Sequence, residues 1–468
     1  MTGKRKRKLA MPDTLIIVAS VVLLVAILSW IIPSGTYDYQ EMNINGRIRN
    51  VAIDGTYHTI DKSEVTTTGF LGFFSVLYRG CVEAADVIFM ILCCCGTFGV
   101  VVKTGAFHAG IGTILKKLKG KEILLVPIIM MIFGLGGSVF GMASEFYGFY
   151  PLIVGLGVAL GYDVMFGFAI IAVGEFVGFM GATLNPYSVG IAQTISGVEL
   201  YSGTGYRAIC FVIFMAISII YVMVYGRKIK KNPGASVVFG EKNIHAFDRD
   251  ELNEYSFTLK DGLVLLDVLV VLVVLMLGLI KWGWDFPQLC GLFLLMSMIA
   301  AAICKWSPNK WCSEFIDSAK TAMWGCILTG IAKAITVVMQ DAQIMDTVIY
   351  GLSNVLKNAP HAVSAQVMLV VQTLINFFIP SATGQASATM PIMAQLADII
   401  GVSRQTAVLA FQFGDGLSNI FWPTADIVII CGLGGISLQK WYKWFTPLFL
   451  ILFVTQAILL GIATGIGF

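Results

Sequence analysis

The chain has 468 residues, of which 57% are hydrophobic and only 13% are charged, and its mean hydropathy is +0.83. Soluble domains carry about 25% charged residues, so this composition excludes a soluble fold. The net charge is only +3. We therefore expect the lipid bilayer as a partner of the chain, and no nucleic acid.

Several apolar runs are long enough to cross a bilayer, whose hydrocarbon core of about 30 Å is spanned by about 20 residues of helix. These runs predict an all-α polytopic membrane protein. The clearest are Thr14 to Ile32, Ile209 to Tyr225, Leu263 to Ile280, Leu289 to Ile303 and Phe445 to Ile462.

The basic residues predict the orientation of these crossings. Lys4 to Lys8 precede the first apolar run. A secretory signal peptide is the alternative, but the run is too long for one and ends at Pro33-Ser34-Gly35 without a cleavage pattern. Short cytoplasmic loops concentrate Lys and Arg, so we expect a cytoplasmic N-terminus in the inner membrane. The other basic clusters fit this topology: Lys116 to Lys121, Arg227 to Lys231 and Lys305 to Lys320.

The ten cysteines do not indicate a metal site. Cys93, Cys94 and Cys95 are consecutive in an apolar run, and the others are scattered through similar runs without metal-ligand spacing. We read them as small packing residues and expect no resident cofactor.

Two interrupted segments stand in the first half of the chain. The stretch from Glu122 to Leu160 is apolar but broken at its centre by glycines and serines. Since each interior glycine costs a helix ~1 kcal/mol relative to alanine, two half-helices joined at a polar tip are expected, as in a re-entrant hairpin. Asp163 to Thr194 begins as a crossing but is interrupted at Gly181 to Pro186, which predicts a broken transmembrane helix.

The same pattern recurs in the second half at a constant offset. Asp415 follows Glu175 by 240 residues, a second hairpin tip is expected at Pro380 to Ser387, and a second helix is broken at Gly414 to Thr424. The first copy starts outside and the second inside, which defines two inverted-topology repeats. The predicted regions are 1–80 (first transmembrane helix and extracytoplasmic segment), 81–226 (repeat 1), 227–304 (cytoplasmic loop and connecting helices) and 305–468 (repeat 2).

Unwound backbone in a membrane must line a cavity or bind something, so four such breaks predict one shared polar site. We expect its substrate-binding residues at the two hairpin tips and the two helix breaks: Ser138, Gly141, Ser144, Glu145, Glu175, Thr183, Asn185, Pro186, Ser381, Thr383, Gly384, Gln385, Ser387, Asp415, Ser418, Asn419, Trp422 and Thr424.

The ionisable residues within the spans are mostly acidic. Glu145, Glu175, Asp415 and Asp426 lie there, with Lys333 the clearest basic residue. Charges inside a membrane are functional by default, so an acidic excess favours a cationic substrate group, a metal ion or a proton. Glu175 and Asp415 have a structural alternative, in which each would bond the neighbouring hairpin. For Lys333 we expect a paired structural charge.

The motifs resemble those of the YfcC-like branch of the ion transporter superfamily over nearly the whole chain. The residues that carry the resemblance are Ile32 to Gly35, Ile379 to Ser381, Met390-Pro391, Arg404-Gln405 and Gln412 to Gly416. This branch groups basic amino acid antiporters with anaerobic four-carbon dicarboxylate carriers. The resemblance implies a homodimer in which a transport region, with both hairpins and both broken helices, moves as an elevator against a scaffold.

The acidic tips and the resemblance together favour a secondary active transporter exchanging arginine for ornithine. The alternative is a four-carbon dicarboxylate carrier or another ion-coupled carboxylate or peptide transporter. A dicarboxylate would favour Arg or Lys at the site, but none of the four tip segments contains either residue. A channel is a further rival. Coupling to Na+ or H+ stays open. We expect no enzyme, because the spans offer no metal-ligand cluster and no nucleophile with a base.

Overall fold

The computed structural model describes residues 13–44, 47–118, 122–240, 257–357 and 363–468. The basic cluster Lys4 to Lys8 lies outside these residues. Within them, seven helices are long and apolar enough to cross a membrane. The prediction of a multi-pass helical chain is therefore confirmed for the described residues.

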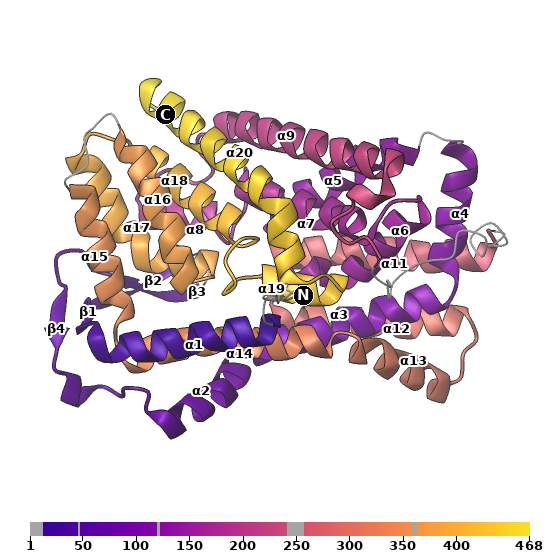
Figure 1. Ribbon diagram of the computed structural model, residues 1–468, viewed down its shortest axis with the longest axis horizontal. Helices are drawn as coiled ribbons and strands as arrows, with labels where there is room; N and C mark the ends of the chain where they lie inside the picture. Colours follow the sequence, from indigo (N-terminus) through magenta and orange to yellow (C-terminus); the bar gives the residue numbers. More distant parts are fainter. Residues whose placement is uncertain (1–12, 45–46, 119–121, 241–256, 358–362) are drawn as a thin grey trace, which may run out of the picture.

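The lower layer in Figure 1 is built of helices that pack as two groups. In one group, α1 and α2 pack against α14, and in the other, α12 and α13 pack against α3. Their bounds are α1 (Thr14–Ile31), α2 (Phe70–Glu83), α3 (Ala85–Lys103), α12 (Phe286–Ile303), α13 (Pro308–Lys320) and α14 (Met323–Asp341). Figure 1 shows α1 with α14 on the left of this layer and α3 with α12 on the right.

The upper layer holds the interrupted segments (Figure 1). Its first half consists of α5 (Leu125–Leu135), α6 (Tyr150–Ala159), α7 (Val164–Met180), α8 (Val189–Ile195) and α9 (Thr204–Lys231). Its second half consists of α16 (Ser364–Phe378), α17 (Ala382–Ile399), α18 (Arg404–Ser418), α19 (Ile427–Gly434) and α20 (Leu438–Gly465).

Two shorter helices stand at opposite ends of the molecule, between the layers: α4 (Ala106–Leu118) and α15 (Met345–Lys357). Both start directly after a lower-layer helix. The turn before α4 contains Gly105 and the turn before α15 contains Gln343, each with positive φ (+85° and +47°). A further helix, α11 (Leu259–Lys281), packs against α12 and α4.

The helix bounds follow the offset expected from the sequence. α7 begins at Val164 and α18 at Arg404, and 404 − 164 is 240. α4 begins at Ala106 and α15 at Met345, and 345 − 106 is 239. The same order of elements therefore occurs twice.

The expectation of an all-α fold is wrong in one segment. Four short strands follow α1 and form two antiparallel pairs. β1 (Ser34–Thr36) pairs with β4 (His58–Ile60), and β2 (Tyr39–Ile44) pairs with β3 (Arg47–Ala52). This segment is too polar for a crossing, so strand pairing satisfies its backbone groups instead. We call residues 34–44 and 47–60 the strand cap.

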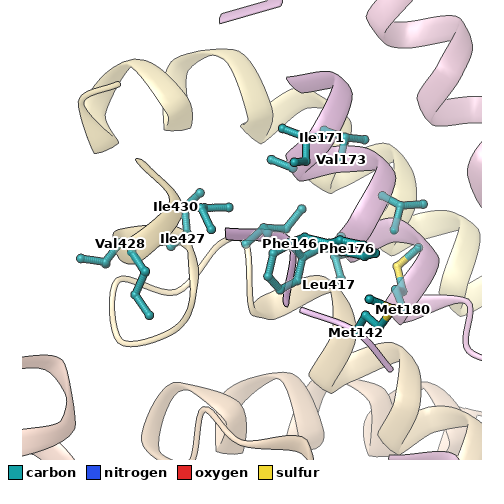
Figure 2. Close-up of a cluster of buried hydrophobic side chains, with 14 of the residues drawn as sticks. Met142, Phe146, Ile171, Val173, Phe176, Met180, Leu417, Ile427, Val428 and Ile430 are labelled. Atoms are coloured by element: carbon teal, nitrogen blue, oxygen red, sulfur yellow. The ribbon is translucent and has the colours of Figure 1, made fainter. Parts of the chain in front are cut away.

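The interrupted segments rest on a common apolar core. All 17 residues of α7 are buried. Figure 2 shows α7 side chains, among them Phe176 and Met180, gathered with Phe146 of the first hairpin, Leu417 of α18 and Ile427 of α19. Because interiors of this kind are closely packed, this core fixes the position of the polar tips above it.

Candidate functional site

The first hairpin tip is bound to the break in α7–α8. Irregular helical turns over Gly136–Phe140 and Ser144–Phe149 join α5 to α6. The Ser138 hydroxyl donates to the Gly181 carbonyl at 3.0 Å, and the Thr183 amide donates to the Ser138 carbonyl at 2.9 Å. These bonds satisfy backbone groups that unwinding leaves free.

Asn185 organises the second half of this break. Its Oδ1 accepts from the amides of Tyr187 (2.9 Å) and Ser188 (3.2 Å), directly ahead of α8. Gly141 has φ +68°, and a Cβ there would lie 2.3 Å from Asn185 Oδ1. Only glycine therefore permits this close approach of hairpin and break.

The second hairpin and break are joined in a similar way. Ser381 precedes α17 and its hydroxyl accepts from the Gly384 amide, which caps the helix. The Trp422 indole donates to the Thr373 carbonyl, and the Thr424 hydroxyl donates to the Phe377 carbonyl, each at 2.7 Å. We call α5–α6 and α16–α17 hairpins 1 and 2, and the interruptions between α7 and α8 and between α18 and α19 breaks 1 and 2. Break 2 is thus held to α16, the first arm of hairpin 2.

Each broken helix carries one fully buried carboxylate that bonds the adjacent hairpin. Glu175 accepts from the Tyr150 hydroxyl at 2.9 Å, and Asp415 accepts from the Asn376 amide at 2.9 Å. The hydrogen bonds that the structural alternative expected between these two acids and the neighbouring hairpins are therefore present. Their other oxygens, Glu175 Oε1 and Asp415 Oδ2, have no hydrogen-bond partner among the described residues.

The four interrupted segments meet one another across the repeats. The Thr383 hydroxyl of hairpin 2 donates to the Tyr187 carbonyl of break 1 at 2.9 Å. The Tyr147 hydroxyl of hairpin 1 donates to Asp426, which follows break 2 as the N-cap residue of α19, also at 2.9 Å. α7 and α18 are in backbone contact, since a Cβ on Gly416 would lie 2.4 Å from the Met180 Cα.

A cavity of about 500 Å³ opens between this meeting point and the lower layer. Hairpin 2, break 2 and hairpin 1 form one wall, and α14 with the end of α2 forms the other. Its polar and charged lining residues are Glu83, Ser144, Thr329, Lys333, Thr336, Gln340, Ser381, Thr424 and Asp426.

Four of the residues predicted for the site line this cavity: Ser144, Ser381, Gly384 and Thr424. The others lie outside its lining, in or beside the contacts between tips and breaks: Ser138, Gly141, Glu145, Glu175, Thr183, Asn185, Pro186, Thr383, Gln385, Ser387, Asp415, Ser418, Asn419 and Trp422. Glu145 is buried and accepts from the Ala143 amide at 3.0 Å, within its own tip. Gln385 is buried between Gln372 and Asn376.

The opposite wall contains residues that the predicted site omitted. Thr329, Lys333, Thr336 and Gln340 follow one another at spacings of four, three and four along α14. Residues spaced in this way share one helix face, so this polar stripe was detectable in the sequence. The reading of Lys333 as a paired charge is wrong, because among the described residues no carboxylate lies within ion-pair distance of it.

The charged groups of the cavity are of both signs. Glu83 and Asp426 are acidic, and Lys333 is basic. No group of three or more metal-ligating side chains occurs in the part of the chain that the structure describes. The arrangement is suited to a small polar molecule that carries positive and negative groups.

A multi-span helical bundle with interrupted helices around such a cavity defines the class of a membrane transporter. Residues 11–465 match the family model of DcuC, the C4-dicarboxylate anaerobic carrier, and the chain belongs to this family. It is therefore a transporter and not an enzyme.

Two curated relatives align with nearly the whole chain. The "Putative basic amino acid antiporter YfcC" of Escherichia coli K12 is 32% identical over 502 residues, covering 100% of this chain and 99% of that protein. An uncharacterized protein of Haemophilus influenzae is 27% identical and covers 99% of each chain. The family resemblance inferred from the motifs is thus confirmed.

Two solved structures also align with the chain. The YdaH transporter of Alcanivorax borkumensis covers 98% of this chain and 99% of its own, at 15% identity and a TM-score of 0.44. MtrF of Neisseria gonorrhoeae, described as one of a class of antimetabolite efflux pumps, covers 97% and 96%, at 16% identity and a TM-score of 0.45.

Proposed function

We propose that the protein exchanges basic amino acids, such as arginine and ornithine, across the cytoplasmic membrane. The observation that carries this proposal is the charge set of the cavity: two carboxylates, Glu83 and Asp426, and one ammonium, Lys333. A basic amino acid has the complementary set of two cations and one carboxylate. Arginine would therefore match each cavity charge with an opposite one.

The walls suggest an orientation for the substrate. Its α-carboxylate would lie between Lys333 and the start of α17, where Ser381 and Gly384 line the cavity. A helix N-terminus presents partial positive charge, which favours a carboxylate there. The α-ammonium and the side-chain cation would then lie near Asp426 and Glu83.

The four-carbon dicarboxylate is the second candidate, because the family carries that description and Lys333 would favour an anion. A dicarboxylate would, however, bring two negative charges to a cavity that already holds two carboxylates. Like charges in a desolvated site cost several kcal/mol, of the order that decides specificity. The match with a relative named as a basic amino acid antiporter supports the first candidate.

For the transport cycle we propose an elevator movement of the upper layer against the lower one, in a homodimer with inverted repeats. The cavity lies between the two layers, and α4 and α15 connect them at opposite ends. Equivalent helices in the two halves support the repeat. Alternating access about a site at the repeat interface is the mechanism such repeats serve.

Counterflow in proteoliposomes tests the substrate. Vesicles loaded with ornithine should accumulate labelled arginine in a saturable manner, and empty vesicles should accumulate much less. Saturation also separates this carrier from a channel. Vesicles that ignore arginine but exchange labelled succinate for internal fumarate would replace the first candidate with the second.

A further inference from the structure

A second cavity, of about 300 Å³, lies away from the transport site, where the turn between α6 and α7 meets the end of α9. Its lining includes Tyr162 and Asp163 of the turn, Lys230 of α9, and Ser236 and Phe239 of the segment that follows α9. These residues take no part in the contacts between hairpin tips and helix breaks.

The acidic group of this cavity is already fully bonded. Asp163 Oδ1 accepts from the Phe166 amide at 2.7 Å, and its Oδ2 accepts from the hydroxyls of Tyr225 (2.5 Å) and Ser236 (2.6 Å). Its negative charge is therefore stabilised by the protein. It is a structural cap for α7, and it is the only acidic residue among the described lining residues of the cavity.

The basic group, in contrast, is free to bind an anion. The Lys230 ammonium lies 5.0 Å above the ring of Tyr162, and among the described residues no carboxylate lies within ion-pair distance of it. Arg227, Lys228 and Lys231 in the last turns of the same helix raise the local positive potential.

The position of the cavity identifies the kind of anion. α9 is one of the helices long enough to cross the membrane, and it carries an exposed apolar stripe. Ile209, Val212, Ile220 and Val224 on this stripe are 56 to 61% exposed. The stripe ends at Val224, less than two turns before Lys230, and Phe239 beside the cavity is 67% exposed. Exposed aromatic and basic residues at the end of a lipid-facing stripe are typical of the headgroup level.

We infer that this cavity binds an anionic phospholipid. Its phosphodiester would lie beside Lys230, its glycerol hydroxyls near Ser236, and its acyl chains along the stripe of α9. The turn between α6 and α7 is the base of the first hairpin, so the bound lipid would fasten that base to α9.

Thermal unfolding of the full-length protein in detergent tests this site with phosphatidylglycerol as the probe. Phosphatidylglycerol should raise the melting temperature, and phosphatidylcholine should not. In Lys230→Gln the lipid concentration for half of the shift should rise about fivefold, the equivalent of about 1 kcal/mol for one basic residue at the membrane surface. Lys228→Gln, on the same turn but outside the cavity, should raise this concentration much less than Lys230→Gln does.

One further variant and one soluble probe, together with Lys228→Gln, distinguish a bound lipid from general surface charge and from a soluble anion. Lys230→Arg should keep the response, which shows that a lost response reflects charge and not misfolding. If Lys228→Gln and Lys230→Gln weakened the response to phosphatidylglycerol equally, general surface charge would explain the effect and the proposed site would be wrong. If sn-glycerol 3-phosphate alone produced the full shift, the cavity would be a site for soluble anions and the lipid assignment would be wrong.

Discussion

The hydroxyl of Tyr147 donates a hydrogen bond to Asp426 at 2.9 Å, although the two residues are 279 positions apart. Tyr147 belongs to the first hairpin and is buried, whereas Asp426 directly follows the second break and lines the central cavity. One residue from each repeat thus forms a single polar unit, in which the tyrosine orients a carboxylate that faces the cavity.

We expect Tyr147→Phe to weaken substrate binding without unfolding the protein. The change removes one hydrogen bond to a charged group, which is worth about 1.5–3 kcal/mol, so KM for arginine should rise by about tenfold or more. Tyr221→Phe is the matched control, since its hydroxyl donates to the Trp444 carbonyl at 2.8 Å, away from the cavity. An unchanged KM in Tyr147→Phe would remove Asp426 from the binding site.

Lys333 should select for the α-carboxylate of the substrate. We therefore expect Lys333→Gln to weaken competition by arginine about tenfold or more, because a charge-assisted hydrogen bond is lost. Agmatine, which is arginine without the carboxylate, should compete equally well with the variant and with the unchanged protein. Competition against labelled arginine in counterflow measures both. Equal losses for arginine and agmatine would assign Lys333 a general structural role, and Lys333→Arg should retain the selection.

Asp415→Asn separates the structural role of this residue from its charge. The asparagine Oδ1 can still accept from Asn376, so the protein should elute from size exclusion as the unchanged protein does. Asp415 Oδ2 is buried and has no hydrogen-bond partner among the described residues. The substitution removes the negative charge of this carboxylate, which a cation or a proton would naturally balance. We expect arginine exchange to be abolished. Normal arginine exchange by this variant would show that Asp415 has only a structural role.

The sequence is most informative where the physical signal is local. The run Ala106 to Leu118 is amphipathic and forms the separate helix α4, and the glycines after Phe133 mark the first hairpin tip. The offset of 240 residues locates the equivalents of these elements in the second half.

The rest depends on contacts between distant parts of the chain. Nothing local in the sequence reveals that Tyr147 meets Asp426. Hydropathy detects crossings and therefore does not predict the strand cap, whose strands contact the distant helices α15 and α17. The polar face of α14 can be detected in the sequence as a helical stripe, but a regular helix has no break to mark that face as part of a site.

The strand cap should depend on Asp346, the residue that fastens it to α15. Asp346 accepts from the Tyr37 amide at 3.1 Å and from the Tyr39 hydroxyl at 2.8 Å. Burial and the Asp346 carboxylate raise the pKa of Tyr39, so its hydroxyl remains a donor at neutral pH.

In Asp346→Ala we expect hydrogen exchange of residues 34–60 to increase by at least tenfold, since each bond to the charged group is worth about 1.5–3 kcal/mol. Glu41→Ala, at an exposed position on β2, is the control. Equal exchange in the two variants would show that the cap is held by other contacts.

The contact between α7 and α18 should tolerate no side chain at Gly416. A Cβ there would lie 2.4 Å from the Met180 Cα and 2.8 Å from its backbone nitrogen, so the two broken helices would have to separate. Overpacking of this kind costs about 1–3 kcal/mol, and we expect Gly416→Ala to lower the melting temperature and to reduce arginine exchange.

Gly351→Ala on α15 is the matched control, because a Cβ there meets no atom within 4 Å. That change should raise stability slightly, by up to about 1 kcal/mol, since alanine favours helix more than glycine does. If both variants melted at the temperature of the unchanged protein, the close crossing of the two broken helices would not constrain the fold.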